Sequence, residues 1–285
     1  MKRIIAAILG TALVGVLAFA GKPITIKGSD TMVILGQRWA EDYMKTHPGT
    51  TIQVTRGGSG TGIAAPINGS ADIAEASRPM KDKEKQEVKA KRGADVVEIP
   101  TALDGIAIYV NEKNPITKIT TAQLKSIYQA DTKKWTALGG PNAEIVLYSR
   151  ENNSGTYTYF KEHILKEEDF SVECQTLPGT AAIINAVAKD PNGIGYGGIG
   201  YSKGVRVLSV AASDSSGYVE PTEASVASGQ YPLARYLYWY CAGAPTGDTK
   251  QLVNWVLGDA GQRVVADVGY YPLPKKTGMP EQKAK

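Results

Sequence analysis

The strongest constraint on the fold is the regular alternation of two kinds of segment along most of the chain. Short apolar runs, typical of strands, are followed by segments whose apolar residues recur every three or four positions, which is typical of helices. Strands are predicted near residues 23–28, 50–56, 71–77, 94–100, 104–111, 144–150, 193–201 and 234–243. Helices are predicted near residues 32–43, 63–68, 81–93, 120–130, 157–164, 178–190, 248–257 and 259–268. This order predicts an α/β protein.

The first 20 residues have the pattern of a secretory signal peptide. Lys2 and Arg3 precede an apolar run, and the tripeptide Ala-Phe-Ala at 18–20 forms a small-residue cleavage site before Gly21. An uncleaved membrane anchor is the alternative, because the run is nearly long enough to span a bilayer. The cleavage site and the lack of a second apolar stretch favour removal. We therefore expect a mature chain that starts at Gly21 and is exported to a bacterial periplasm.

The charge balance and the two histidines argue against several classes of site. Of the 32 basic residues, Lys2 and Arg3 lie in the signal peptide, which leaves 30 against 28 acidic residues. This balance, without a basic stripe, argues against nucleic-acid binding. The mixed charges of residues 81–93 indicate a solvated helix face. His47 and His163 have no metal-ligand spacing, so we expect no metal site and no cofactor.

Cys174 and Cys241 are the only cysteines. An oxidising compartment would allow a disulfide between them. Their separation in sequence does not say whether their Cα atoms come within bridging distance, so the pairing stays open at this point.

Three segments share one design, in which a predicted strand is followed by a tight turn of glycine, serine and threonine and then by a helix. They are residues 27–32 (KGSDTM), 56–62 (RGGSGTG) and 149–157 (SRENNSGTY). The first turn of a helix leaves N–H groups unpartnered and carries partial positive charge, and glycine lets a ligand approach the backbone. Three such turns, if they converge, would make a site for a compact anion. Arg150 would add charged donors there, and Ser154 and Thr156 would add hydroxyls.

Two other interpretations of these turns have to be weighed. A serine or threonine between a strand and a helix is often only a cap for the helix. An enzyme would need a catalytic motif, but the glycines at 57–62 lack the Lys-Ser/Thr of a Walker loop and fall short of G-x-G-x-x-G. Ser59 lacks the G-x-S-x-G spacing of a nucleophile elbow, because position 61 is threonine. The sequence therefore contains no catalytic constellation, and anion binding and helix capping both remain open.

Together these motifs resemble the periplasmic phosphate-binding proteins of Pst-type ABC importers. The resemblance rests on GSDT at 28–31, GGSGTG at 57–62, ADIAEASRPM at 71–80, SRENNSGTYTYF at 149–160 and GIGYGGIGY at 193–201, which occur in the family's order. It implies a type II periplasmic-binding-protein fold. Two α/β lobes with mixed sheets would be joined by a two-strand hinge and close over a dehydrated phosphate. The lobes would be residues 21–104 plus 240–285, and residues 105–239.

The resemblance also implies which residues bind phosphate. They are Ser29, Asp30 and Thr31 in the first turn, Ser59 and Gly60 in the second, and Arg150, Ser154, Gly155 and Thr156 in the third. Ser77 and Arg78 also belong to the expected binding set, and well-known members carry an aspartate at the position of Ser77. That carboxylate accepts the proton of hydrogen phosphate, which sulfate lacks. Asp30 could take over the acceptor role, or it could point outward as a charge at the helix start.

The resemblance therefore implies a solute-binding protein, monomeric and not an enzyme. It would capture inorganic phosphate and deliver it to the permease subunits of an ABC transporter in the inner membrane. The main alternative is a binding protein for another oxyanion, such as sulfate, molybdate or tungstate, because the same turns could serve these ligands. An exported phosphatase is a weaker alternative, since the sequence offers neither a nucleophile nor metal ligands for it.

Overall fold

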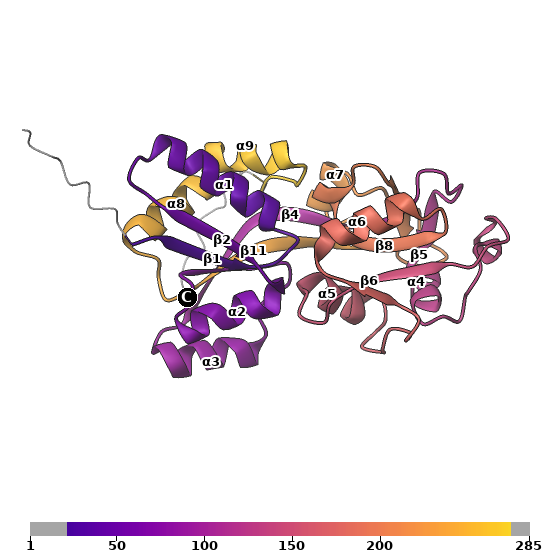
Figure 1. The fold of residues 1–285 in the computed structure, drawn as a ribbon, viewed down its shortest axis with the longest axis horizontal. Helices are drawn as coiled ribbons and strands as arrows, with labels where there is room; N and C mark the ends of the chain where they lie inside the picture. Colours follow the sequence, from indigo (N-terminus) through magenta and orange to yellow (C-terminus); the bar gives the residue numbers. More distant parts are fainter. Residues whose placement is uncertain (1–21, 275–285) are drawn as a thin grey trace, which may run out of the picture.

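The computed structural model describes residues 22–274, which form two lobes that lie side by side along the longest axis of the molecule (Figure 1). The predicted signal peptide at 1–20 lies outside the described residues. The first lobe contains β1 (Ile24–Gly28), α1 (Val33–Thr46), β2 (Ile52–Arg56), α2 (Gly58–Asn68), β3 (Ile73–Ala76), α3 (Asp82–Arg92), α8 (Gly247–Leu257) and α9 (Asp259–Val268). The second contains β5 (Lys118–Thr120), α4 (Thr121–Tyr128), β6 (Val146–Arg150), α5 (Gly155–His163), β7 (Gln175–Leu177), α6 (Gly179–Lys189), β8 (Gly193–Gly198), β9 (Arg206–Val207), β10 (Ser209–Ala211) and α7 (Glu223–Ala227). The strands β4 (Val96–Val110) and β11 (Ala234–Ala242) run between the lobes, and two short 3₁₀ helices lie at Trp135–Leu138 and Ile199–Tyr201.

The strand β4 joins the two sheets because it is long enough to belong to both. Residues 96–105 pair antiparallel with β11, and residues 106–110 pair antiparallel with β8. The two separate strands predicted at 94–100 and 104–111 are therefore one strand of 15 residues. Pro100 does not end it, because the ladder with β11 shifts register there, and a bulge is a place where a strand tolerates proline.

Through β4 the sheets of the two lobes form one continuous sheet with the strand order β2-β1-β3-β11-β4-β8-β6-β7. The strand β9 pairs with β4 outside this order. The strand β1 is parallel to β2 and β3, and β6 is parallel to β7 and β8. The crossing strands β4 and β11 are antiparallel to their neighbours, so each lobe has a mixed sheet. Ligands of open α/β sheets bind beyond the carboxyl ends of the parallel strands, and those of β1, β2 and β6 lead into the three glycine-serine-threonine turns.

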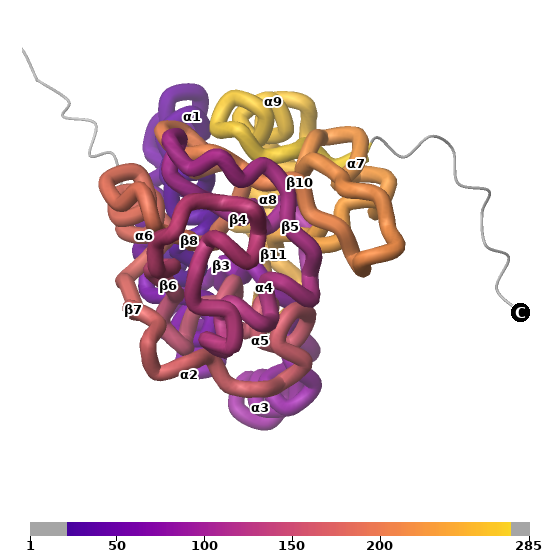
Figure 2. Tube along the Cα trace, turned by 90° about the vertical axis from the view of Figure 1, so that its right-hand side faces the viewer, coloured from indigo at the N-terminus to yellow at the C-terminus, as the bar shows by residue number. Residues whose placement is uncertain are grey.

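Helices cover both faces of the first lobe's sheet. Two views at right angles place α1 and α9 on one side and α2 and α3 on the other (Figures 1 and 2). The predicted apolar stripe of α1 is buried, including Leu35, Trp39 and Tyr43. Burying each such side chain contributes about 1.5–3 kcal/mol. The ring of Trp39 meets that of Trp239 edge to face, with centroids 5.3 Å apart, so α1 is packed directly against the crossing strand β11.

The second lobe has its own apolar core. Trp135, Phe160 and Tyr196 are fully buried there, in a cluster separate from the one under α1. Cys174 packs against this core, whereas Cys241 belongs to the core of the first lobe. Both thiols are free, so the disulfide that the sequence left open is not part of this fold.

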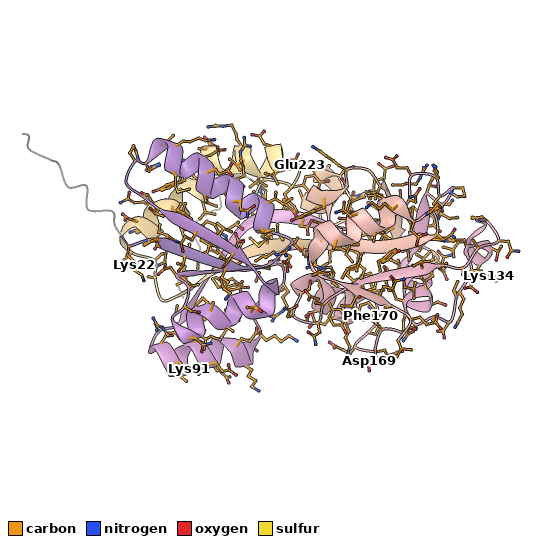
Figure 3. The ribbon with its side chains drawn as sticks, in the orientation of Figure 1. Lys22, Lys91, Lys134, Asp169, Phe170 and Glu223 are labelled. Atoms are coloured by element: carbon orange, nitrogen blue, oxygen red, sulfur yellow. The ribbon has the colours of Figure 1, made fainter. Side chains whose placement is uncertain are left out.

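Two local features of the helices follow directly from the sequence. Thr120 caps α4 in a capping box, in which its hydroxyl oxygen accepts the N–H of Gln123 and the Gln123 side chain accepts the N–H of Thr120. The charged helix α3 buries only Val88, and Lys91 projects from its outer side (Figure 3). Among residues 22–274, no helix is long and apolar enough to cross a membrane.

Candidate anion-binding site between the lobes

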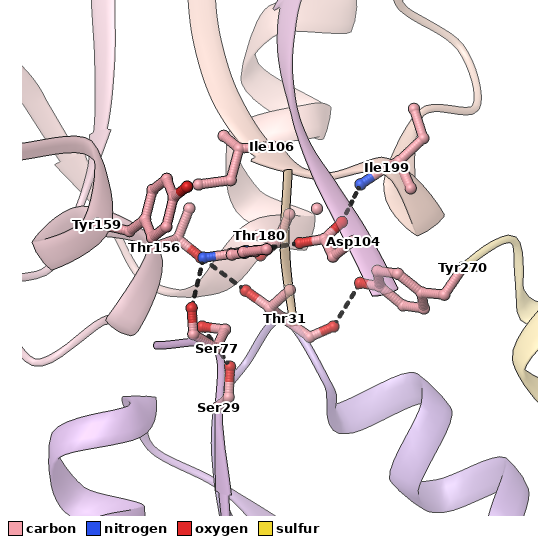
Figure 4. A network of polar contacts seen from close by, with 12 residues as sticks. Ser29, Thr31, Ser77, Asp104, Ile106, Thr156, Tyr159, Thr180, Ile199 and Tyr270 are labelled. Carbon is pink, nitrogen blue, oxygen red and sulfur yellow. Dashed lines mark hydrogen bonds and ion pairs between the residues drawn. The ribbon is translucent and has the colours of Figure 1, made fainter. Parts of the chain in front are cut away.

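The three glycine-serine-threonine turns come together where the two lobes face each other. The hydroxyl oxygens of Thr31, before α1, and Thr156, in the first turn of α5, lie 2.8 Å apart and are hydrogen-bonded (Figure 4). Gly155 lies so close to the start of α2 that a Cβ added to it would be 2.4 Å from Ser59 Oγ. The helix starts of α1, α2 and α5 therefore converge, as anion binding requires.

Three serine hydroxyls form the floor of this site on the side of the first lobe. Ser29 Oγ donates to Ser77 Oγ at 2.9 Å, and Ser59 Oγ lies 3.3 Å from the same oxygen. Ser59 Oγ also accepts the backbone N–H of Ser77 at 3.0 Å. All three side chains are buried. A hydroxyl carries one donor and two acceptor lone pairs, so this group of serines can rearrange its hydrogen bonds around an anion.

The capping interpretation holds for one of the turns. Ser154 Oγ accepts the N–H groups of Thr156 and Tyr157 at the start of α5, at 3.2 Å and 3.3 Å. Neither α1 nor α2 has a side-chain cap. The segment at 57–62 differs from its predicted form as well, because α2 already begins at Gly58 and the glycine-rich turn is its first turn. The hydroxyls of the first two turns are therefore not explained by capping.

Arg150 at the end of β6 carries its charge into the interior. Its side chain is 1% exposed, and its Nη1 donates to Thr180 Oγ1 at 2.7 Å. Its Nη2 lies 3.4 Å from Asp30 Oδ2, and its buried Nε has no hydrogen-bond partner among the described residues. Burial lowers the pKa of the guanidinium, and the Asp30 carboxylate opposes that shift. Arg150 thus retains a donor for a further acceptor.

Asp30 points inward rather than to the solvent. It is 7% exposed, and its backbone oxygen accepts the hydroxyl of Tyr201 from the second lobe at 2.8 Å. Of the two orientations considered for this residue, the structure has the buried one. A buried carboxylate acceptor therefore lies beside Arg150 between the two lobes.

Two residues of the expected set are engaged elsewhere in this conformation. Arg78 directs its guanidinium to Glu84, with Nη1 and Nη2 at 2.8 Å and 2.7 Å from the carboxylate oxygens. The N–H of Gly60 donates to the backbone oxygen of Asn153 in the other lobe at 2.9 Å. The Asn153 amide donates back to Gly57 O at 3.0 Å. Neither Arg78 nor the Gly60 amide joins the hydroxyl cluster here.

The structure adds buried polar residues that the motifs did not reveal. Thr180 accepts from Arg150, as described above, and Arg235 and Asp104 form a buried ion pair on the two crossing strands. A signal for this pair exists in the sequence, because each residue is a charge within a strand of mostly apolar residues. Nothing in the sequence marks Thr180 as a site residue, because it is an ordinary residue near the start of α6. Within residues 22–274, no group of three or more His, Cys, Asp and Glu side chains could hold a metal ion.

Comparison with known proteins identifies the family of this chain. A family model described as a PBP superfamily domain matches residues 15–260. The phosphate-binding protein PstS of Pseudomonas aeruginosa is 38% identical over 266 residues, which cover 87% of this chain and 82% of that protein. The chain belongs to the PstS family of phosphate-binding proteins. A second PstS-family protein, from Staphylococcus epidermidis, is 34% identical over 260 residues, or 88% of this chain and 79% of its own.

Solved structures give the same PstS-type fold. A Clostridium perfringens protein described as a phosphate ABC transporter substrate-binding protein, solved with bound phosphate, superposes with a TM-score of 0.80 at 29% identity. It covers 89% of this chain and 100% of its own. An ABC-type phosphate transport receptor from Vibrio cholerae superposes with a TM-score of 0.70 at 27% identity and covers 88% of this chain and 100% of its own. The expected type II fold of two lobes is thereby confirmed for this PstS-family chain.

Proposed function

We propose that this protein captures inorganic phosphate between its two lobes and delivers it to an ABC transporter. The observation that carries the proposal is Arg150, a buried guanidinium that contacts the Thr180 hydroxyl of the second lobe and the Asp30 carboxylate of the first, and whose Nε has no partner among the described residues. A buried charge is costly unless it is well paired, and the pairing of Arg150 with Asp30 is a single contact of 3.4 Å. A phosphate anion would supply further acceptors for this guanidinium, and the names of the relatives and of the solved neighbours point to the same ligand.

The binding residues would be those of the three turns, together with Ser77 and Thr180. In this structure the hydroxyls of Ser29 and Ser77, and those of Thr31 and Thr156, bond to each other. Phosphate would replace these bonds with bonds to its own oxygens, so each hydroxyl would donate outward. Arg150 would neutralise the charge of the anion. Arg78, which is held by Glu84, and the Gly60 amide would contribute only if their present contacts break.

Asp30 is the residue proposed to select phosphate over sulfate. A carboxylate has only acceptors, so it would accept the proton of hydrogen phosphate and repel the fully ionised sulfate. It would replace the aspartate that well-known family members carry where this chain has Ser77. Binding of another oxyanion, such as sulfate, molybdate or tungstate, is the second candidate, and the hydroxyl at Ser77 is the observation that favours it.

Capture and release would be a hinge motion. The boundaries proposed for the lobes are 21–104 plus 240–285 and 105–239, with β4 and β11 as the hinge. Phosphate enters when the lobes part, and the closed form is what the permease subunits recognise. The protein would act as an exported monomer in the periplasm after loss of residues 1–20. It would have no enzymatic activity, no cofactor and no metal.

Equilibrium dialysis with radiolabelled phosphate tests the proposal. The phosphate-free protein should retain the label, and excess unlabelled phosphate should displace it while excess sulfate should not. Displacement by both anions would favour the general oxyanion binder. No retention of label would overturn phosphate capture. Turnover of a phosphomonoester would revive the phosphatase.

A further inference from the structure

Asp104 and Arg235 face each other directly across the hinge. They are register partners on the antiparallel strands β4 and β11. Arg235 donates to Asp104 Oδ2 from Nε at 2.9 Å and from Nη2 at 2.7 Å. The other carboxylate oxygen accepts the N–H of Ile199 at 2.9 Å, and both side chains are buried. The ion pair is therefore anchored in the strands about which the lobes would move.

The remaining donors of Arg235 reach one residue in each lobe. Its Nη1 donates to the backbone oxygen of Ser77, which follows β3, at 2.7 Å. Its Nη2 donates to Thr156 Oγ1 in the first turn of α5 at 3.0 Å. The ring of Tyr159, one turn further along α5, lies 5.7 Å from the guanidinium carbon, within the range of a cation–π contact. One side chain thus contacts both walls of the candidate site.

This arrangement constrains the hydroxyl of Thr156. A guanidinium has donors and no acceptor, so Thr156 Oγ1 has to accept from Arg235 and its proton is left to donate elsewhere. An oxyanion has acceptor oxygens that need such donors. The Arg235 contact therefore orients the hydroxyl for an anion before the anion arrives, which is preorganisation.

The same contacts depend on lobe closure. Asp104 and Arg235 stay together when the lobes rotate, because both lie on the hinge strands β4 and β11. Ser77 and Thr156 belong to opposite lobes, so the guanidinium cannot keep both contacts once the lobes part. Breaking either contact gives up a hydrogen bond from a charged group, which contributes more than a neutral hydrogen bond.

We propose that Arg235 is a positioning residue for anion capture, which couples the orientation of the Thr156 hydroxyl to closure of the two lobes. The anion-capture part rests on the proposed phosphate function. The closure part does not, because it concerns contacts between residues of the protein alone. Arg235 acts through Thr156 and Ser77, and Asp104 balances its charge.

The substitution Arg235→Lys tests this role, because it keeps a positive charge for Asp104 but has no fork to span both lobes. We expect phosphate affinity in calorimetry to fall about tenfold or more, as befits a lost hydrogen bond from a charged group. We also expect the ligand-free radius of gyration, from small-angle X-ray scattering, to rise as the lobes open. Arg38→Lys is the matched control, since Arg38 pairs with Asp42 at the surface of α1. It should change neither quantity.

A double-mutant cycle separates positioning from a merely structural role. In the background of Thr156→Val, which lacks the accepting oxygen, Arg235→Lys should cost much less affinity than in the natural protein. If Arg235→Lys does not fold, the apolar pair Arg235→Met with Asp104→Leu keeps the hinge packed and should show the same loss and the same opening.

Additive effects in the cycle, or unchanged phosphate affinity in the folded Arg235 variants, would overturn the positioning role. An unchanged ligand-free radius of gyration would overturn the coupling to closure. If the natural protein binds no phosphate, the proposed function fails. The scattering comparison of ligand-free proteins then still decides whether Arg235 favours the closed lobes.

Discussion

Arg150 and Asp30 form a buried ion pair across the two lobes, with Nη2 of the arginine 3.4 Å from Oδ2 of the aspartate. The contact is single and long compared with the paired short contacts between Arg78 and Glu84. Short, two-pronged arginine–carboxylate pairs are the strong ones. The Arg150 pair is thus loose enough to admit an additional acceptor, while each partner keeps the other from being an isolated buried charge.

Removing the charge of Arg150 should abolish most of the affinity for phosphate. We expect Arg150→Ala to weaken binding by about 2–5 kcal/mol, because the buried anion would lose its charged partner. Calorimetry measures the change, with Arg38→Ala as a surface control that should bind normally. Binding of Arg150→Ala with the affinity of the natural protein would remove Arg150 from the site.

Asp30 should determine the choice between phosphate and sulfate. Asp30→Asn replaces an acceptor-only carboxylate with an amide that can also donate. We expect the ratio of phosphate to sulfate affinity to fall by about tenfold or more, because sulfate no longer meets a repelling carboxylate. Competition dialysis gives the ratio directly, and Asp42→Asn on the surface of α1 is the control. A ratio that stays fixed would show that Asp30 is not the discriminating acceptor.

The contact between Gly155 and the serines should be sensitive to a single methyl group. A Cβ at this position would lie 2.4 Å from Ser59 Oγ and 2.8 Å from Ser77 Oγ, on the opposite lobe. Gly155→Ala should therefore hold the lobes apart and lower phosphate affinity about tenfold, without lowering the thermal stability of either lobe. Gly217→Ala is the matched control, because an added Cβ there meets nothing within 4 Å. Equal affinity of the two variants would contradict the close approach of the lobes.

Glu75 should make the stability of the protein depend on pH. Burial raises the pKa of this carboxyl from 4.5 to about 8, although the N–H of Trp239, 3.1 Å away, favours the charged form. Its other oxygen has no hydrogen-bond partner among the described residues. Because the folded state holds the proton more tightly, this contribution is fully present below pH 4.5, declines above it and is lost as the pH rises through about 8.

The substitution Glu75→Gln removes this titration while nearly preserving the shape of the side chain. The free energy of unfolding, measured in urea across that pH range, should fall less steeply with pH in Glu75→Gln than in the natural protein. The difference should reach several kcal/mol at the alkaline end. Parallel pH profiles would mean that Glu75 does not carry a raised pKa.

Much of the fold can be predicted from the local sequence pattern, because the helices and strands with a strong periodicity of apolar residues are also the well-packed ones. The stripe of Met32, Leu35, Trp39 and Tyr43 predicts α1, and all four side chains are buried. The short strands β5, β7, β9 and β10 were not predicted, because segments of two or three residues are too short to show the alternation of apolar and polar residues. The single strand β4 was not predicted, because a proline such as Pro100 normally ends a strand. Only the pairing with β11 shows that a bulge accommodates this proline.

Part of the candidate site could be predicted from the sequence in the same way. Its three turns stand out in the sequence because glycine, serine and threonine cluster after strands, and the structure brings them together. The direction of Arg78 could not be read from the sequence, since it depends on Glu84 one helical turn into α3. The Asp104–Arg235 pair joins residues 131 positions apart, and only the register of two crossing strands makes them neighbours.

The most direct test of the central claim is calorimetric titration of the refolded, phosphate-free protein with phosphate and with sulfate, at about pH 5 and about pH 8, where phosphate but not sulfate keeps a proton. We predict tight binding of phosphate at both pH values and no heat of binding with sulfate, which would show that an acceptor operates although position 77 is serine. Comparable binding of the two anions would contradict the account and make the protein a general oxyanion binder. Absence of binding by either would refute anion capture altogether.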